Sequence, residues 1–587
     1  MSEPDLLRHL KNLVAVQLVD MESADRFLFH HELTRQAAYS SLLLRERKTL
    51  HHTVGAAMER LYADAVEAHA AELAYHFYAA EAWDKAFDYS VRAGNRAQAQ
   101  YAPRAAAEHF TRAIDAARQR GAEPPLELYR SRGQAHETLG EFDAARNDFQ
   151  ALLDGARRHG DRPSEWQALM DLGFLWAAFD YERTGEYFQQ ALELARRLDD
   201  SATLARNLNR IGNWHLNIEQ PEAAHQYHLE ALRIFESLDD KQGLAATHDL
   251  LGITYLVLCD MHQSDAHYER AMALFRELND RGGLLSSLLI HAGRGTNYLG
   301  NTAVNLPASA AEQIRDAEMA LQMALDIDAR PAVGMSQMWL GLIHSSVGGY
   351  GRALNHLREG LQRAETIEHR HFMAVGHMIL GALYVDILAL SIARRHLEQA
   401  LSLARETGSH IWMGTITAFL AGACIGQGDL DTAEAYLGQR LTSDLPMQTM
   451  PQRQLWAARA ELRLAQNRPD EALRIVERLI SAAPNRDRAG EHAIPRLGHL
   501  RGRALVALNR FEEAQRVLSE ACAVAELCAL RPFTWRIQAS LASLYRAVGR
   551  PGAAADAAAQ ARAIVEELAA TLDDADLRAE FRRSAVN

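Results

Sequence analysis

The chain has 587 residues, more than a single compact core accommodates, so we expect several domains or one elongated array. A formal net charge of −13 argues against a protein that holds nucleic acid through general electrostatic attraction. No signal peptide is visible, and no apolar run is long enough to span a membrane. The four cysteines show neither zinc-ligand nor disulfide spacing, so we expect buried thiols in a soluble, cytoplasmic protein.

Residues 1–65 have a different pattern from the rest of the chain. Apolar spacing over Leu6–Val19 predicts an amphipathic helix, and Arg26–Phe29 predicts a short strand. Two further helices are expected over Glu32–Leu43 and Arg45–Tyr62. A helix, a strand and further helices in so short a space suggest a partial winged-helix-like module.

Three histidines near the N-terminus, His31, His51 and His76, are candidates for metal ligands. Their spacing fits neither a zinc motif nor a catalytic motif. We therefore expect them to pack and form hydrogen bonds in a helical junction. The basic residues of this module are interspersed with acidic ones, so no helix with a phosphate-binding face is indicated.

From Gly94 onward, a small residue recurs at intervals of 39 to 49 residues. We call these small residues anchors: Gly94, Gly133, Gly173, Gly212, Gly252, Ala292, Gly341, Gly381, Ala421, Ala460, Gly502 and Ala542. Alanine stands twelve residues after the anchor in nine of the twelve repeats. Two repeats also carry a ring sixteen residues after the anchor, His228 and Tyr268. Small residues where two helices cross, followed by large ones, are typical of the tetratricopeptide repeat (TPR).

This regular series of anchors predicts an all-α fold, a right-handed TPR-like superhelical solenoid of about twelve helix pairs. Its usual period of about forty residues exceeds the roughly 34 of a standard TPR, so slightly longer helices are expected. Acidic pairs such as Asp199–Asp200 and Asp239–Asp240 should cap the helices. Glycines such as Gly348 and Gly428 should end the first helix of a pair with a positive φ.

One repeat is about nine residues longer than the others, and the extra residues fall at 300–310. This small, polar segment predicts a longer turn between two helices. We favour a tolerated surface insertion, and a functional loop is the alternative. Prolines within 442–451 and 481–495 suggest joints, which gives four predicted segments. These are the module 1–65, a main solenoid 66–441, a C-terminal TPR block 442–570 and a tail 571–587, whose Leu572, Leu577 and Phe581 should cap the last pair.

Several motifs resemble one known family. One reads Phe29-x-His31-x-Leu33-x-Arg35-x-x-Ala38-Tyr39, followed by Arg47-x-x-Leu50-His51. It resembles the segment that joins a winged-helix module to a TPR sensor in STAND-type signal-transduction ATPases. The stretch Ala71–Phe77 and the C-terminal tail are also similar to that family, whose members include relatives of the maltose-operon activator and of cyclase-linked predicted ATPases. The resemblance implies a sensor or scaffold region that lacks the nucleotide-binding domain.

The sequence carries no recognised catalytic motif. It has no GxxxxGK[ST] phosphate loop, no HExxH, no GxSxG, and no pair of carboxylates that stands out from solvated helix faces. We therefore expect a chain that is not an enzyme and that binds no cofactor and no metal.

In TPR arrays, the first helix of each pair lines the concave groove. Positions six and three before the anchor, and one, four and five after it, point inward. Asparagines in the Gly212 repeat suit hydrogen bonding to a peptide backbone, methionines would make the groove adaptable further on, and a basic stretch follows near the C-terminus. The predicted groove residues are Arg206, Asn209, Asn213, Asn217, Asp249, Asn297, Met335, Met338, Met378, Arg496, His499 and Arg503. The alternative is that these side chains are merely solvated.

These features predict a non-enzymatic scaffold for protein interaction or effector sensing, similar to the sensor region of a bacterial signal-transduction or transcription-regulating ATPase. Its expected partner is a protein or peptide, or a small effector, with no membrane and no direct contact with nucleic acid. The alternative is a free-standing TPR adaptor that bridges protein partners. TPR arrays serve many functions, so the repeats alone do not choose between these two.

Overall fold

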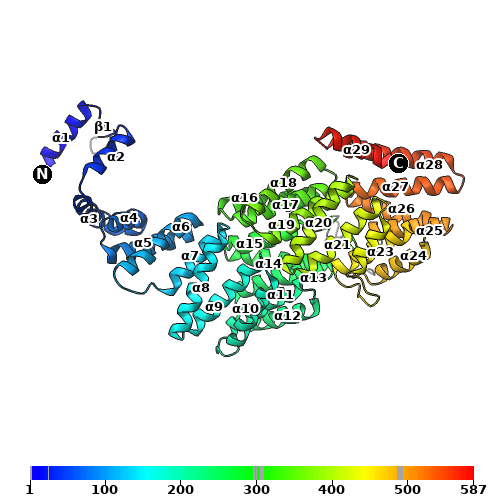
Figure 1. Ribbon diagram of the computed structural model, residues 1–587, viewed down its shortest axis with the longest axis horizontal. Coiled ribbons are helices and arrows are strands. Elements are labelled where there is room, and N and C mark those ends of the chain that lie inside the picture. Colours follow the sequence, from blue (N-terminus) through cyan, green and yellow to red (C-terminus); the bar gives the residue numbers. More distant parts are fainter. Residues whose placement is uncertain are drawn as a thin grey trace. The chain divides into compact units, whose positions relative to one another are not determined.

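The computed structural model describes residues 3–23, 26–294, 296, 298, 301–304, 310–485 and 494–586. This part of the chain is almost entirely helical (Figure 1). It divides into two compact units, Met1–Ala135 and His136–Asn587. None of the described helices is long and apolar enough to cross a bilayer. The segment boundaries predicted at residues 65, 441 and 570 stay predictions.

The first unit combines helices with one small antiparallel sheet. Its elements are α1 (Glu3–Ala15), β1 (Val19–Met21), β2 (Phe27–Phe29), α2 (Glu32–Ser41), α3 (Leu44–Leu61), the 3-10 helix η1 (Ala63–His69), α4 (Ala70–Ala79), α5 (Trp83–Ala99) and α6 (Pro103–Gln119). Strand β2 and helices α2 and α3 agree with the predicted elements. The winged-helix assignment of this region stays a prediction.

The predicted helix Leu6–Val19 is wrong at its C-terminal end. Helix α1 stops at Ala15, because Val19 already belongs to β1 and pairs with Phe29 of β2. Strand β1 has only three residues, too few for an alternating pattern to stand out from a helical one. The expected packing of the junction histidines is confirmed for His51 and His76, whose Nδ1 atoms lie 2.9 Å apart. Burial lowers the pKa of both.

Twelve helix pairs follow one another from α5 to α28 in the described chain, as the series of anchors predicted. After α5, the first helices are α7 (Leu126–Thr138), α9 (Arg162–Trp176), α11 (Ser201–Asn217), α13 (Lys241–Val257), α15 (Arg281–Ala292), α17 (Arg330–Ser346), α19 (Arg370–Asp386), α21 (His410–Gly426), α23 (Met450–Ala465), α25 (Pro495–Ala507) and α27 (Arg531–Ala547). After α6, the second helices are α8 (Phe142–His159), α10 (Tyr181–Ala195), α12 (Pro221–Leu238), α14 (Met261–Glu277), α16 (Ala310–Asp326), α18 (Tyr350–Thr366), α20 (Leu390–Thr407), α22 (Leu430–Gly438), α24 (Pro469–Ser481), α26 (Phe511–Leu527) and α28 (Pro551–Ala570). Every anchor lies in a first helix, and the tail forms α29 (Ala575–Val586).

The anchors are small because the two helices of a pair touch there. A Cβ atom added to Gly212 would lie 2.7 Å from Cε1 of His228, and one added to Gly252 would lie 2.8 Å from Cε2 of Tyr268. Real Cβ atoms do not approach other atoms so closely, so only glycine fits without a shift. The predicted pairing of a small anchor with a ring sixteen residues later is confirmed in both repeats.

The helix ends also follow the predicted chemistry. The Asp240 carboxylate accepts a hydrogen bond from the backbone N–H of Gly243, and Asp200 caps α11 in the same way. Gly348 and Gly428 end the first helices of their pairs with φ values of +88° and +78°. The aspartate caps set where these helices begin, and the glycines with positive φ set where they end.

Residues of the second unit that lie 221 to 225 positions apart contact one another. The Arg440 guanidinium lies 3.4 Å from the Glu219 carboxylate, and the Asn485 amide donates to Asp260 at 2.7 Å. These separations equal between five and six repeats. The array therefore coils so that successive superhelical turns touch.

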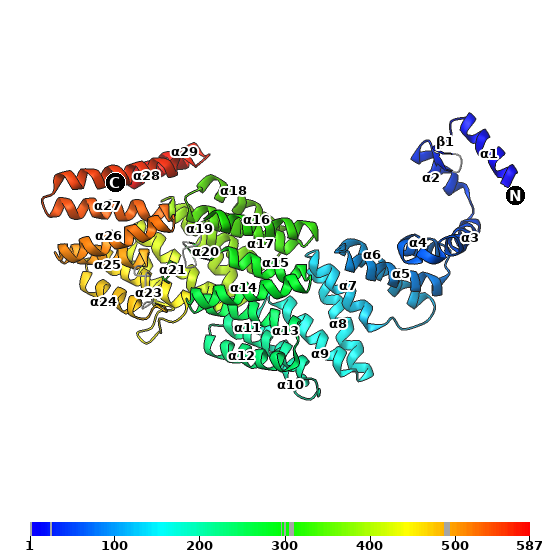
Figure 2. The ribbon, with the colours of Figure 1, turned by 180° about the vertical axis from the view of Figure 1, so that it is seen from behind.

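The C-terminal tail takes part in the same contact between turns. Leu572, Leu577 and Phe581 are buried, as predicted for a cap, and α29 packs against α28. Helix α29 also lies beside α18 (Figure 2). There the Phe581 ring meets Tyr350 of α18, with ring centroids 5.9 Å apart. The backbone N–H of Gly351 donates to the carbonyl of Thr571 at 3.0 Å. The tail thus covers the last pair and joins it to an earlier turn.

Candidate binding groove

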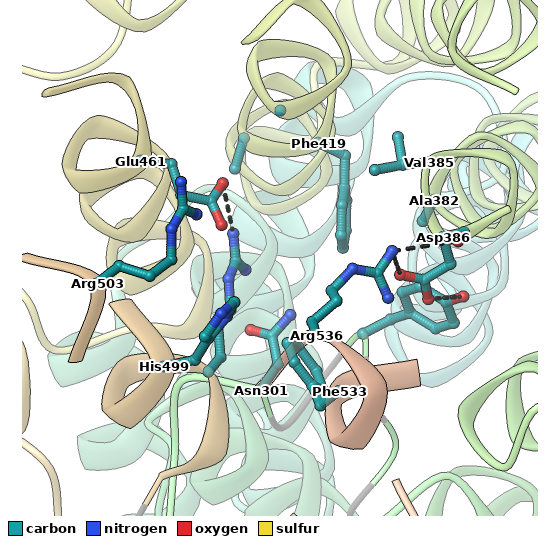
Figure 3. Close-up of a pocket in the computed structure, with 14 residues that line it drawn as sticks. Asn301, Ala382, Val385, Asp386, Phe419, Glu461, His499, Arg503, Phe533 and Arg536 are labelled. Atoms are coloured by element: carbon teal, nitrogen blue, oxygen red, sulfur yellow. Dashed lines mark hydrogen bonds and ion pairs between the residues drawn. The ribbon is translucent and has the colours of Figure 1, made fainter. Parts of the chain in front are cut away.

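A cavity of about 180 Å³ opens on the inner surface of the C-terminal repeats (Figure 3). Five consecutive first helices, α19, α21, α23, α25 and α27, line it together with residues from the connection between α15 and α16. Its apolar lining consists of Ala382, Val385, Ala418, Phe419, Gly422 and Phe533. Its charged side chains form two groups on opposite sides of Phe419.

Asp386 and Arg536 form the first group. The Arg536 guanidinium lies 3.3 Å from the Asp386 carboxylate and donates to the Asp386 backbone carbonyl at 3.1 Å. The Tyr298 hydroxyl donates to the same carboxylate at 2.9 Å. Burial raises the pKa of Asp386, and the positive charge of Arg536 opposes that rise. This pair joins α19 to α27 across 150 residues.

Glu461, Arg496, His499 and Arg503 form the second group. Arg496 lies 3.5 Å from the Glu461 carboxylate. His499 Nε2 lies 2.8 Å from the Ser540 hydroxyl, and burial lowers the pKa of this histidine to about 3, so the ring is neutral at pH 7. Arg503 is exposed. No carboxylate or other acceptor in the described chain pairs with Arg503.

Part of the insertion between α15 and α16 forms a wall of the cavity. Asn301 lines the cavity with only 6% of its surface exposed, and no group in the described chain bonds to its side-chain oxygen. Arg453 of α23 is fully buried and donates from Nε and Nη2 to the Thr302 carbonyl at 3.0 and 2.7 Å. Gln454 donates to the Tyr298 carbonyl at 2.6 Å.

The favoured prediction of a surface insertion is therefore wrong for the described residues 301–304, which are all buried. Its predicted place between the two helices of the pair is correct. The signal that could have revealed this is Arg453 and Gln454, which stand seven and six residues before the anchor Ala460 on a first helix of the array. Inward-facing donors on such a helix require acceptors, and the insertion carbonyls supply them.

The three basic residues predicted near the C-terminus, Arg496, His499 and Arg503, all line this cavity. The same inward positions, applied to the repeats around them, yield Asp386, Glu461 and Arg536. These three were not among the predicted residues. Asp386 was already conspicuous as the one charge that interrupts the apolar run Ile379–Leu390. Phe419, Phe533 and the insertion residues fall outside the rule.

The predicted asparagine strip lies elsewhere, and its best-defined contacts are between repeats. The Asn209 amide is buried and donates to the Thr247 hydroxyl of the next repeat at 2.7 Å. Asp249 stands at the same position of that repeat and accepts from the Ser287 hydroxyl at 2.6 Å. Burial raises the pKa of Asp249 to about 6. In both cases a polar side chain three residues before one anchor forms a hydrogen bond with a hydroxyl five residues before the next anchor.

The other predicted residues occupy varied places. Arg206 is exposed and lies 3.6 Å from Asp240. Asn213 and Asn217 are half-buried, and the Asn217 amide donates to the Asn213 carbonyl within the same helix. Asn297 lies outside the described residues. The methionines are core residues, with exposures of 8%, 0% and 2% for Met335, Met338 and Met378.

The described chain offers neither a metal site nor a disulfide. It contains no group of three His, Cys, Asp or Glu side chains placed to hold a metal ion. All four cysteines are free thiols; Cys259, Cys424 and Cys522 are buried, and Cys528 is half-buried.

One family model matches part of the repeat array. Residues 173–237 match the tetratricopeptide repeat family. No curated protein matches the chain. The Rap conjugation gene regulator of the plasmid pLS20, solved in complex with the Phr* peptide, is 14% identical with a TM-score of 0.40, over 50% of this chain and 76% of its own. Yeast Tom70 is 15% identical with a TM-score of 0.32, over 86% of this chain and 94% of its own.

A STAND protein with a tetratricopeptide repeat sensor from Pyrococcus horikoshii is also similar, at 15% identity and a TM-score of 0.36. The similarity covers 73% of this chain and 57% of the STAND protein. This chain therefore matches little more than half the length of that ATPase.

Proposed function

We propose that this chain is a non-enzymatic TPR scaffold that binds a protein or peptide, or a small effector, in the groove of its C-terminal repeats. The observation that carries the proposal is the cavity where five consecutive first helices meet. It combines exposed charge with apolar side chains in one concave place, which is the usual composition of a binding site.

The contacts of the insertion support a peptide as the ligand. Arg453 and Gln454 project from α23 and donate hydrogen bonds to backbone carbonyls of an irregular segment, at Thr302 and Tyr298. A bound peptide offers the same carbonyl groups. The inner side chains of this array are therefore suited to hold non-helical backbone next to the cavity.

We further propose that the chain serves as the sensor of a STAND-like signalling ATPase. The motifs near its N-terminus support this role, as does the surface of residues 3–61. Large apolar side chains are exposed there, among them Leu33 at 76%, Leu61 at 74% and Leu43 at 70%. So many exposed large apolar residues in one short stretch of sequence are typical of a surface that another domain or protein covers. A neighbouring gene for a phosphate-loop ATPase would favour this role over that of a free-standing adaptor.

The test is capture of a partner by the full chain from a lysate of the source cells, with Phe419→Ala as the groove variant. Phe419 lines the cavity, so its truncation should abolish or strongly reduce capture. The control is Leu238→Ala, which truncates an exposed apolar side chain at the end of the second helix α12. Equal capture by wild type and Phe419→Ala would contradict the proposal. A parallel Asn213→Ala/Asn217→Ala variant tests the predicted asparagine strip in the same assay.

A further inference from the structure

Two histidines lie where successive superhelical turns of the second unit touch. His369 and His371 stand at the start of α19, and they meet residues around the turn between α9 and α10. The backbone N–H of His371 donates to the Ala178 carbonyl at 3.1 Å, and the Tyr181 hydroxyl lies 3.4 Å from Nδ1 of His371. The His369 ring is buried and packs against Phe179, with ring centroids 6.4 Å apart. We call these five residues the histidine contact.

The hydrogen bonds of His371 fix which of its ring nitrogens carries the proton. The indole N–H of Trp412 on α21 donates to Nε2 of His371 at 3.3 Å. Tryptophan can only donate, so Nε2 must be the unprotonated nitrogen of a neutral ring. Nδ1 then carries the proton and donates to the Tyr181 hydroxyl. A second proton on this ring would place its N–H group against the N–H group of Trp412, with no acceptor for either.

His369 is also held as an acceptor. It is the N-cap residue of α19, and its Nδ1 accepts a hydrogen bond from the backbone N–H of Phe372 at 3.3 Å. A backbone N–H can only donate, so a proton on Nδ1 would remove this cap. The rings of Phe142, Phe179 and Phe372 pack against the imidazole and offer it no acceptor. Both histidines therefore support the contact only while they are neutral.

The surroundings oppose protonation of both rings. Burial lowers the pKa of His371 to about 4 and that of His369 well below its usual value, and repulsion between the two rings adds to the second shift. Tyr181 is the titratable group that faces His371, and burial raises its pKa, so it stays neutral. The charged or titratable residues next to the contact on these elements have partners elsewhere or are exposed: Glu141, Asp180, Arg183, Glu368, Arg370 and His410.

We infer that the histidine contact is pH-sensitive: it holds the superhelical turns together while His369 and His371 are neutral, and protonation of the two rings opens it. This inference concerns regulation of the array and does not depend on what the groove binds.

The direction of the pH effect follows from the two states of the contact. In the open state both rings are solvated and recover a pKa near 6.5. Between pH 6.5 and about 4 the open state therefore binds protons that the closed state does not bind. The ratio of closed to open molecules must fall as the pH falls through this interval, by up to about tenfold per pH unit for each histidine.

A neighbouring contact between the turns responds to acid in the opposite direction. Burial raises the pKa of Glu219, whose carboxylate lies 3.4 Å from the Arg440 guanidinium. The closed state binds this proton more readily than the open state, so protonation of Glu219 favours closure. Variants of the histidines are therefore needed to separate their effect from that of Glu219.

Backbone hydrogen exchange in the first turn of α19 reports on the histidine contact. N–H groups in the first turn of a helix have no acceptor within the helix. Here the N–H of His371 is held by the Ala178 carbonyl, and that of Phe372 by the His369 ring. Mass spectrometry of the full chain, with rates divided by the intrinsic rate at each pH, measures their protection. We expect this protection to fall about tenfold or more between pH 7.5 and pH 5, while the middle of α18 stays protected.

Two substitutions supply matched side chains that do not titrate. Asparagine is a good N-cap residue, so His369→Asn retains an acceptor for the Phe372 N–H. His371→Gln retains an acceptor for the indole N–H and a donor toward the Tyr181 hydroxyl. The double variant should keep the same protection in this turn at both pH values. His159→Gln, at an exposed histidine at the end of α8, should behave as wild type.

Equal protection of the wild-type turn at pH 7.5 and pH 5 would overturn the inference, as would an equal loss in wild type and the double variant. Loss of protection throughout the array at pH 5 would also overturn it, because acid would then unfold the repeats rather than part the turns. Should the double variant fail to fold, each single variant is expected to show a smaller fall than wild type. A fall as large as that of wild type in both single variants would contradict the role of the histidines.

Discussion

At the scale of single residues, each helix pair depends on what faces its anchor. Opposite Gly173 the facing residue is Phe188, opposite Gly252 it is Tyr268, and opposite Gly212 it is His228. His228 is fully buried, and its Nε2 has no partner in the described chain. Its Nδ1 lies 3.3 Å from the Asn209 side chain. A titratable ring thus occupies a position that an apolar ring fills elsewhere.

This position predicts a pH-dependent stability. Burial lowers the pKa of His228 from its usual 6.5 to about 3. The unfolded chain therefore binds a proton below pH 6.5 that the folded chain does not bind until about pH 3. Folding stability must fall as the pH falls through this interval, by up to about 1.4 kcal/mol per pH unit for this group.

His228→Phe should remove that loss, since Phe110 stands at the same spacing from its anchor Gly94 and faces it in the same way. We expect the variant and wild type to have similar urea-unfolding curves at pH 7.5, and the variant to be more stable at pH 5. Circular dichroism at both pH values measures this. His159→Phe, at an exposed histidine at the end of α8, is the control. A difference between His228→Phe and wild type that does not change with pH would contradict the argument.

At the scale of elements, the insertion is stabilised by one buried side chain. The Arg453 guanidinium donates to the carbonyls of Thr302, Met447 and Leu479. Those carbonyls lie in three separate segments, each next to α23. Arg453 therefore fastens two irregular connections and the last turn of α24 to α23, and within the described residues hydrogen bonds offset the burial of its charge.

Arg453→Met should preserve much of the volume and remove every one of these donors. We expect a loss of about 3 kcal/mol or more in the free energy of unfolding, since several buried carbonyls would lose a charged partner. The insertion wall should also loosen, so any ligand of the cavity should bind more weakly. Urea denaturation and ligand titration measure both effects. The exposed Arg474→Met on α24 is the control, and unchanged stability of Arg453→Met would contradict this role.

The elements also show what the sequence predicts and what it does not. The helix pairs are predictable because an anchor and its facing ring, such as Gly252 and Tyr268, are close in sequence. The basic stretch ending at Arg503 is predictable for the same reason. The pair of Asp386 and Arg536 is not, because the superhelix brings together residues of repeats far apart in the chain. Asn209 looked like a groove residue because the period alone does not separate inward positions from those that face the next repeat.

At the scale of the whole second unit, the contacts between turns change the usual account of a solenoid. In an open array each repeat contacts only its neighbours, so stability spreads through nearest-neighbour interfaces. Here Thr571 accepts a hydrogen bond from the backbone N–H of Tyr350 and donates one to the Gly348 carbonyl, more than 220 residues away. The end of the array is therefore coupled directly to its middle, and the cavity lies within the turn that this contact closes.

This coupling predicts a long-range effect of a substitution in the tail. Phe581 is fully buried between Tyr350 and Trp535. Phe581→Ala should cost about 3–5 kcal/mol locally and undock α29. The amides of Tyr350 and Gly351 donate to Thr571, so their hydrogens should exchange faster with solvent once the tail leaves.

Hydrogen exchange measured by mass spectrometry on peptides that cover α18 tests this expectation. The control is Leu527→Ala, which truncates a side chain that is 75% exposed at the end of α26. Faster exchange in α29 alone, with α18 unchanged, would show that the turns touch without sharing stability. Faster exchange in both α29 and α18 would establish that the contact between the tail and α18 is cooperative. Weaker partner capture by the same variant would then extend the coupling to the cavity, because Arg536 lies on α27 next to Trp535.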